Sequence, residues 1–131
     1  MNKILFVDDN ASLGKFYVLM LEREGWQITH VETEAAAMNF IAENEACPCV
    51  LLDYKLADAY SDALAEVLRK KYPDTFMVMI SGDPPHKEKI VSLLERGIIN
   101  DFMEKPFSID VVLDKFKGGR LSSVTGQLSP R

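Results

Sequence analysis

The sequence is poor in cysteine and has no excess of positive charge. Its 131 residues include two cysteines, Cys47 and Cys49, in a Cys-Pro-Cys stretch. This spacing suits neither a zinc knuckle nor a thioredoxin-type redox pair, so we expect no metal or redox role for them. The 20 acidic residues outnumber the 15 basic ones, so the chain lacks the overall positive field that attracts DNA phosphates or anionic lipid. Direct binding of nucleic acid is not expected.

The sequence also lacks an apolar run long enough to cross a bilayer, which takes about 20 residues. Its start turns acidic at Asp8 and Asp9, before the apolar core of a signal peptide could form. We therefore expect a soluble, cytoplasmic protein that makes no membrane contact. With 47% hydrophobic residues, a chain of this length can bury the core of one compact domain without disulfides or structural metal.

Five short apolar segments alternate with stretches of helical periodicity. The strand candidates are residues 4–7, 27–31, 49–52, 76–80 and 101–103. The first, third and fourth are almost continuously apolar, as is typical of parallel strands covered on both faces. This strict alternation predicts an α/β fold of the flavodoxin-like (βα)5 type, a doubly wound parallel sheet with strand order 2-1-3-4-5.

The helical periodicity ends near the carboxyl terminus of the chain. Its last apolar set runs from Ile109 to Phe116, and a Gly-Gly pair follows at residues 118 and 119. The remaining segment is rich in glycine and serine and has no helical pattern. We predict one domain over residues 1–117, followed by a flexible tail or the start of a linker at residues 118–131.

Polar residues follow four of the five predicted strands. Asp8 and Asp9 come after the first, Asp53 after the third, Ser81 after the fourth and Lys105 after the fifth. In an open parallel sheet, ligands bind in the crevice beyond the carboxyl ends of the strands. Each residue alone also fits a structural role, because acids after strands often cap helices and Ser-Gly is an ordinary turn. Their combination at one edge of the sheet favours a functional site.

The three aspartates of this set predict a cation site. Strands 1 and 3 are neighbours in the predicted order, so Asp8, Asp9 and Asp53 should converge, and their repulsion is costly unless a cation lies among them. Oxygen ligands favour Mg²⁺, with Mn²⁺ as the alternative, over Zn²⁺. Lys105 adds a positive charge and Ser81 a hydroxyl group, which together can hold the oxygens of a phosphoryl group on Asp53.

Four motifs carry these residues in order: Ile-Leu-Phe-Val-Asp-Asp-Asn, Val-Leu-Leu-Asp-Tyr, Met-Ile-Ser-Gly and Asp-Phe-Met-Glu-Lys-Pro-Phe. As an ordered set, they resemble the receiver domain of two-component response regulators, of the chemotaxis-receiver type, over residues 3 to about 116. The resemblance implies that Asp53 accepts a phosphoryl group from a histidine kinase or phosphotransfer protein in a Mg²⁺-dependent reaction. It also implies a signalling domain that catalyses only its own phosphorylation and dephosphorylation.

The resemblance assigns a role to each residue that holds the ion or the phosphoryl group. Asp8, Asp9 and Asp53 would bind Mg²⁺ together with the backbone carbonyl group of Lys55. Lys105 would contact the phosphoryl group, and the peptide bond that follows it, to Pro106, would be cis.

The resemblance also implies a conformational switch. Ser81 would be the switch hydroxyl and Phe102 the switch aromatic, although Phe102 fits a plain core position equally well. Phosphorylation would then change the surface of the fourth helix, fifth strand and fifth helix. An output domain, a downstream protein or a second copy in a homodimer would recognise this surface.

The segment after Asp53 departs from the family pattern. Relatives commonly have Met-Pro and then Asp-Gly there, whereas this chain has Tyr-Lys-Leu-Ala-Asp-Ala-Tyr-Ser-Asp-Ala. We expect a loop of different shape into the third helix. The two histidines, His30 and His86, have no carboxylate or cysteine neighbours at ligand spacing, and His86 lies in a solvated His-Lys-Glu-Lys run. Neither is assigned a role.

Three other functions are alternatives for a parallel sheet with acidic residues at its carboxyl edge. An aspartate-nucleophile phosphohydrolase needs two acids two positions apart after the first strand, whereas Asp8 and Asp9 are adjacent. A flavodoxin-like electron carrier needs a Ser/Thr/Gly-rich phosphate loop there, and Asp-Asp-Asn-Ala-Ser-Leu-Gly is too acidic for that. A scaffold of receiver fold that is never phosphorylated usually loses a site residue, and this chain keeps them all.

Overall fold

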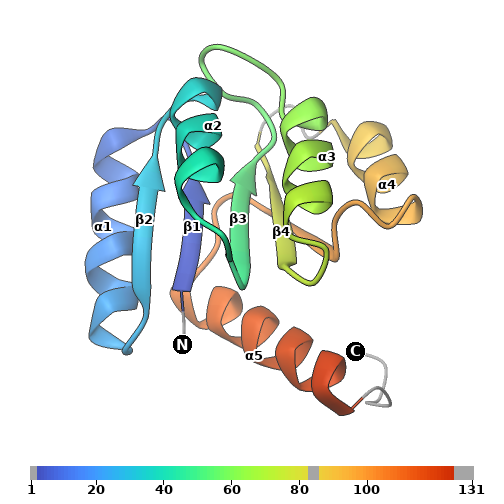
Figure 1. Ribbon diagram of the computed structural model, residues 1–131. Coiled ribbons are helices and arrows are strands. Elements are labelled where there is room, and N and C mark those ends of the chain that lie inside the picture. The colour runs from blue at the N-terminus through green and yellow to red at the C-terminus, as the bar shows by residue number, and fades with distance from the viewer. Residues whose placement is uncertain (1–2, 83–85, 126–131) are drawn as a thin grey trace.

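The computed structural model describes residues 3–82 and 86–125, with the side chains of 118–125 outside the description (Figure 1). Strands and helices alternate along the whole described chain. In order they are β1 (Lys3–Val7), α1 (Ala11–Arg23), β2 (Gln27–Val31), α2 (Glu34–Glu43), β3 (Cys49–Asp53), α3 (Asp62–Lys71), β4 (Phe76–Ser81), α4 (Lys87–Glu95), β5 (Asp101–Glu104) and α5 (Ile109–Thr125). Within these residues, none of the helices has both the length and the apolar character needed to cross a bilayer.

The strands form one parallel sheet in the order β2-β1-β3-β4-β5, which confirms the predicted fold. β1 lies between β2 and β3, and its last residue, Val7, pairs with Leu52 of β3. Asp8 and Asp53 each come one residue later. The register therefore places these two aspartates side by side at the carboxyl edge of the sheet.

Helices cover both faces of the sheet, and the strands alternate their side chains between two cores. In β1, Leu5 and Val7 join one core, whereas Ile4 and Phe6 join the other. Helices α2, α3 and α4 complete the first core, and α1 and α5 complete the second (Figure 1). All five residues of β3 are buried, which explains the continuous apolar run that predicted it.

Element ends follow the expected chemistry. The side chain of Thr33 accepts a hydrogen bond from the backbone N–H of Ala36 and caps α2. Gly25 and Gly97 follow α1 and α4 with φ of 90° and 76°, a left-handed conformation that glycine adopts without strain. Three strands end one residue later than predicted, so Asp53, Ser81 and Glu104 are their last residues.

Helix α5 continues past the predicted end of the domain. A tail or linker was expected from residue 118, yet the helix runs to Thr125. A glycine inside a helix costs only about 1 kcal/mol relative to alanine and no proline follows directly, so the Gly-Gly pair does not force the helix to end. Residues 126–131 lie outside the described part of the chain. The division into a domain of residues 1–117 and a tail remains a prediction.

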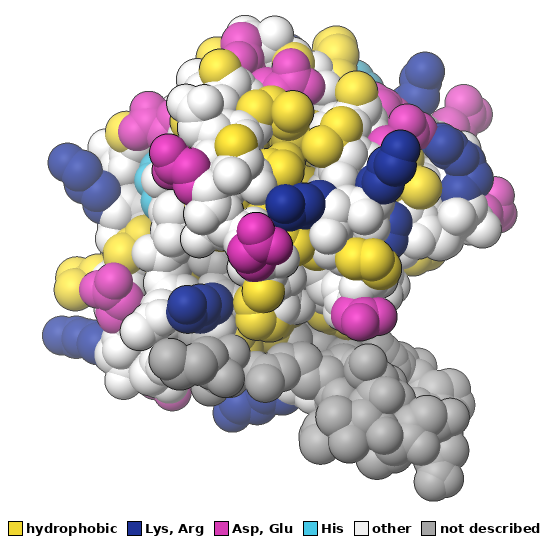
Figure 2. Space-filling model, in the orientation of Figure 1, with side chains coloured by type: hydrophobic (Ala, Val, Ile, Leu, Met, Phe, Trp, Pro, Cys, Tyr) yellow, Lys and Arg dark blue, Asp and Glu magenta, His cyan; other side chains and the backbone are white. Residues whose placement is uncertain are grey.

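The surface carries charges of both signs. Figure 2 shows acidic and basic side chains interspersed on one face, with apolar atoms between them. Nucleic-acid-binding proteins instead concentrate lysine and arginine on one face or along one helix. The face shown does not have that character.

Candidate functional site

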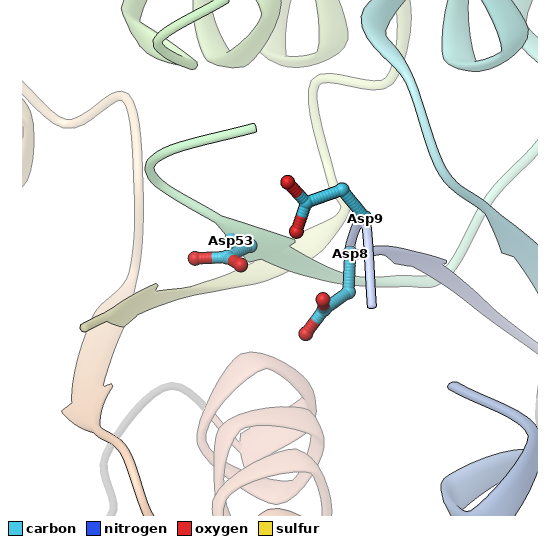
Figure 3. Close-up of side chains that lie close together, drawn as sticks. All are labelled: Asp8, Asp9 and Asp53. Carbon is cyan, nitrogen blue, oxygen red and sulfur yellow. The ribbon is translucent and has the colours of Figure 1, made fainter. Parts of the chain in front are cut away.

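Three aspartates meet at the carboxyl edge of the sheet. Asp8 and Asp9 follow β1, Asp53 ends β3, and one carboxylate oxygen from each lies within 4.8 Å of the others (Figure 3). Asp8 and Asp53 are buried, whereas Asp9 is exposed. The structure therefore brings together the three side chains that the sequence predicted as ligands of one cation.

The environment of Asp8 leaves one carboxylate oxygen available to a cation. Its Oδ1 accepts a hydrogen bond from the backbone N–H of Asn10 at 2.8 Å. Its Oδ2 is buried and accepts no hydrogen bond from the described residues, although the Nζ of Lys105 lies 3.4 Å away. A buried acceptor beside two further carboxylates is the oxygen-rich donor set that Mg²⁺ or Mn²⁺ prefers. The residues present thus fit a hard divalent cation.

Lys105 neutralises part of this negative charge. It directly follows β5, and its Nζ donates to Oδ2 of Asp53 at 2.9 Å. Its backbone N–H donates to the carbonyl oxygen of Ser81 at 2.9 Å, and its peptide bond to Pro106 is cis, as the resemblance implied. These contacts attach the lysine to the end of β4 and direct its amine toward Asp53.

Tyr17 of α1 contacts the segment between β5 and α5, which begins with Lys105. Its hydroxyl group donates to the carbonyl oxygen of Phe107 at 3.0 Å, and the two rings stack with centroids 4.9 Å apart. Phe107 lies two residues beyond Lys105. This contact was not predictable from the sequence, because the helical periodicity at Tyr17 indicated only a core position.

The charges of the site change its pKa values. Burial raises the pKa of Asp53 to about 6, Lys105 opposes this increase, and Asp8 and Asp9 add to it. Burial alone would lower the pKa of Lys105, but its contacts with Asp53 and Asp8 outweigh burial and raise it. Lys105 therefore stays protonated, whereas Asp53 changes its charge within a physiologically relevant range.

The two residues assigned to the switch lie near each other on β4 and β5. Ser81 is buried at the end of β4, opposite Glu104 of β5. Phe102 pairs in register with Met79 and packs, partly buried, against the core formed with α2, α3 and α4. Phe102 thus occupies a position that fits a core residue and a mobile aromatic alike.

The loop after Asp53 is closed by its own hydrogen bonds. Lys55 and Tyr60 form an antiparallel bridge, and the N–H of Leu56 donates to the carbonyl oxygen of Ala59 at 2.8 Å. The loop is therefore a small hairpin. It begins at Lys55, two residues beyond Asp53. The ligand role of the Lys55 carbonyl group remains a prediction.

Ser61 connects this hairpin back to Asp53. Its side chain is fully buried, and its hydroxyl group donates to the carbonyl oxygen of Asp53 at 2.6 Å. Ser61 precedes α3 but makes no side-chain cap, because the hydroxyl group bonds Asp53 instead. Sequence reasoning missed this residue, and a serine directly before a helix was the available signal.

His86 is less solvated than its sequence neighbours indicated: it is half-buried, whereas Lys87, Glu88 and Lys89 are exposed. Its ring lies 5.2 Å from that of Tyr54 and 5.4 Å from that of Tyr60, between centroids. His86 has φ of 48°, and its Nε2 is buried without a hydrogen-bond partner among the described residues. The preceding residues, 83–85, lie outside the described part of the chain. His86, directly before α4, thus packs against the two tyrosines of the segment that follows Asp53.

His30 contacts the aspartate site directly, although its sequence neighbours gave it no role. Its Nε2 lies 2.8 Å from the carbonyl oxygen of Asp8. This contact was not predictable from sequence spacing, because the two residues are 22 positions apart and meet only through the pairing of β1 with β2.

One parallel sheet of strand order 2-1-3-4-5 thus carries three aspartates and a lysine at its carboxyl edge. A family model described as the response regulator receiver domain matches residues 4–117. The chain belongs to this family, which confirms the resemblance drawn from its motifs.

Curated relatives include regulators and sensor proteins. The chain is 30% identical to the transcriptional regulatory protein YxdJ of Bacillus subtilis over 89% of its own length and 49% of that protein. It is 26% identical to the CAI-1 autoinducer sensor kinase/phosphatase CqsS of Vibrio cholerae, over 86% of the chain and 16% of the relative. The chain thus spans less than half the length of these relatives.

A solved structure supports the same assignment. The response regulator receiver domain protein (CheY-like) from Methanospirillum hungatei is 27% identical, with a TM-score of 0.86, and the alignment covers 97% of this chain and 99% of that one. Nearly every element of the fold therefore has a counterpart in a receiver domain.

Proposed function

We propose that this receiver domain accepts a phosphoryl group on Asp53 in a Mg²⁺-dependent reaction. The observation that carries the proposal is the pairing of Asp53 with Lys105 beside a buried oxygen of Asp8, which accepts no hydrogen bond within the described residues and lies 3.4 Å from the Lys105 amine. Positive charge is thus already present at the nucleophile, and the remaining negative charge suits one divalent cation. Asp8, Asp9, Asp53 and the carbonyl group of Lys55 would hold that ion.

The chemistry is an in-line transfer from a phosphohistidine. A carboxylate oxygen of Asp53 attacks phosphorus, the bond from phosphorus to the donor imidazole breaks, and an acyl phosphate forms on Asp53. Lys105 neutralises charge on the non-bridging oxygens and remains protonated throughout. Bound Mg²⁺ would supply further charge neutralisation at the same oxygens. The donor is a histidine kinase or phosphotransfer protein, and the domain catalyses only its own phosphorylation and dephosphorylation.

The output follows from a shift between two states. Ser81 would move toward the new phosphoryl group, and Phe102 would turn inward, which changes the surface formed by α4, β5 and α5. Two ion pairs on this surface, Lys87 with Glu104 and Lys115 with Asp101, are available for rearrangement. An output domain, a separate downstream protein or a second copy of the chain would bind the changed surface.

Intact mass spectrometry tests the proposal. The protein is incubated with Mg²⁺ and acetyl phosphate, beside an Asp53→Asn variant and a reaction without Mg²⁺. One base-labile phosphoryl adduct on the wild type, absent from both controls, is expected. A folded wild type that binds Mg²⁺ and forms no adduct would contradict phosphorylation and favour a receiver-shaped interaction module instead.

A further inference from the structure

Gly14 occupies an unfavourable position for its residue type. It is buried in the first half of α1, where glycine is among the poorest helix formers. Such a local conflict between residue type and element often marks a position with another constraint. The constraint here is spatial: a Cβ atom at this position would lie 2.0, 2.4 and 2.5 Å from three ring atoms of His30.

The missing side chain of Gly14 makes room for the imidazole of His30. The ring lies between α1 and the sheet, with its centroid 5.3 Å from that of Phe6. Its Nε2 lies 2.8 Å from the carbonyl oxygen of Asp8. A carbonyl oxygen only accepts hydrogen bonds, so Nε2 carries the proton and donates.

This contact completes a set of three bonds around Asp8. Its backbone N–H donates to the carbonyl oxygen of Val31 at 3.0 Å, and its Oδ1 accepts from the N–H of Asn10 at 2.8 Å. With the carbonyl oxygen held by His30, Oδ2 is left facing the site. The carbonyl group also belongs to the peptide that joins Asp8 to Asp9, so one hydrogen bond orients the backbone of both acids.

We propose that His30, accommodated by Gly14, is a positioning residue that fixes the Asp8–Asp9 peptide for cation binding. The inference rests on the proposed function, because it concerns the ion that the phosphoacceptor site uses. His30 does not touch the ion. It acts as outer-sphere partners of metal sites do, by removing alternative orientations of the groups that bind the metal.

Mg²⁺ affinity measured by calorimetry on the full chain tests this inference. His30→Phe removes the hydrogen-bond donor and keeps an aromatic ring. Gly14→Ala keeps the histidine, but the added methyl group on α1 displaces the imidazole from the Asp8 carbonyl oxygen. Each is expected to weaken Mg²⁺ binding by roughly tenfold, at the lower end of the effect of outer-sphere substitutions. The double variant should lose little more than either single one, because both remove the same contact. Thr29→Val, on the adjacent exposed position of β2, is the matched control with unchanged affinity.

A second readout separates positioning from general destabilisation. The amide resonance of Asp9 reports on the peptide that His30 holds, and it should shift in His30→Phe even without Mg²⁺. His30→Gln places an N–H donor near the position of Nε2 and should restore Mg²⁺ affinity, whereas the shorter His30→Asn should not. If His30→Phe does not fold, the comparison of His30→Gln with His30→Asn still tests the positioning role of His30.

The outcomes distinguish this inference from the proposed function. Equal Mg²⁺ affinity of the wild type, His30→Asn and Gly14→Ala, all folded and with a phosphorylatable Asp53, overturns the positioning role and leaves the proposed function intact. A wild type that neither binds Mg²⁺ nor takes a phosphoryl group overturns both.

Discussion

The amine of Lys105 lies 2.9 Å from a carboxylate oxygen of Asp53 and connects the ends of β5 and β3 across β4. Because this amine lowers the pKa of Asp53, Lys105→Met should raise that pKa further. It should also slow phosphorylation by acetyl phosphate by about 100-fold, the usual loss when one charge-stabilising donor is removed.

Lys115 provides the matched control for that variant. It forms an ion pair of similar length, 2.8 Å, with Asp101, the first residue of β5 and thus at the opposite end of the strand from Lys105. Lys115→Met should leave the rate of phosphorylation nearly unchanged. Equal loss of rate in the two variants, followed by intact mass over time, would contradict a direct role of Lys105.

The pH dependence of phosphorylation should reveal the environment of Asp53. Without a cation its pKa is raised to about 6 by burial, and only the carboxylate attacks phosphorus. At low Mg²⁺ the rate should therefore rise as the pH increases through about 6. Saturating Mg²⁺ favours the ionised form, so the midpoint should move to lower pH. A midpoint that does not respond to Mg²⁺ would show that the ion is not beside Asp53.

Asp53→Asn should stabilise the cation-free protein at neutral pH. The folded pKa of Asp53 lies above the value of about 3.9 expected for an unfolded chain. The protonated form therefore stabilises the fold below about pH 4, and this contribution is lost as the pH rises through about 6. Asparagine avoids the buried charge, so the free energy of unfolding in urea should increase by about 1–3 kcal/mol. The difference should shrink below pH 4 and on addition of Mg²⁺.

Ser61→Ala should destabilise the protein by removing a hydrogen bond to the backbone of Asp53. The buried hydroxyl group is a donor to the carbonyl oxygen of Asp53 at 2.6 Å, and its loss should lower the free energy of unfolding by about 1–2 kcal/mol. Ser12→Ala, on an exposed position of α1, should change it by less than about 0.5 kcal/mol. Urea titration measures both, and equal values would argue against a structural role for the Ser61 bond.

Arg69 should contribute far more to stability than Arg96, although Arg96 forms a short ion pair with Glu66. Its guanidinium donates to the carbonyl oxygens of Ile98, Pro73 and Thr75 and to the side chain of Asn100. Arg69→Met removes all four of these hydrogen bonds, and among the described residues only the Asn100 oxygen keeps another donor, the N–H of Met77, so the free energy of unfolding should fall by about 2–4 kcal/mol.

Arg96 is the control for this comparison. It pairs with Glu66 at 2.6 Å, but the two side chains are 52% and 47% exposed, and exposed ion pairs contribute less than about 1 kcal/mol. Thermal and urea unfolding of Arg96→Met should therefore resemble those of the wild type. A larger decrease in the free energy of unfolding for Arg96→Met than for Arg69→Met would contradict the larger contribution of Arg69.

The sequence was sufficient to predict the sheet because its signals are local. Continuous apolar runs such as residues 49–52 are typical of strands covered on both faces, and the strand order then places Asp8 beside Asp53. The position of Lys105 was predictable for the same reason, because this residue directly follows the last strand of the sheet. What could be predicted depended on periodicity and on the geometry of parallel sheets.

The contacts that sequence reasoning missed depend on loop conformation and on space between elements. Ser61 reaches Asp53 only because the intervening residues form a hairpin, and no spacing rule encodes that shape. His30 reaches Asp8 only because Gly14 has no side chain. The glycine inside a predicted helix was visible in the sequence, but the ring that fills its place was not.

The alternation of β1 between two cores constrains how the chain can change in length. Phe6 packs into one core and Val7 into the other, so a single inserted residue would exchange these faces and move Asp8 away from Asp53. Insertions and deletions within the strands are therefore incompatible with the site. The opposite edge, where each helix passes into the next strand, can gain or lose residues while the distances between the aspartates and Lys105 stay unchanged.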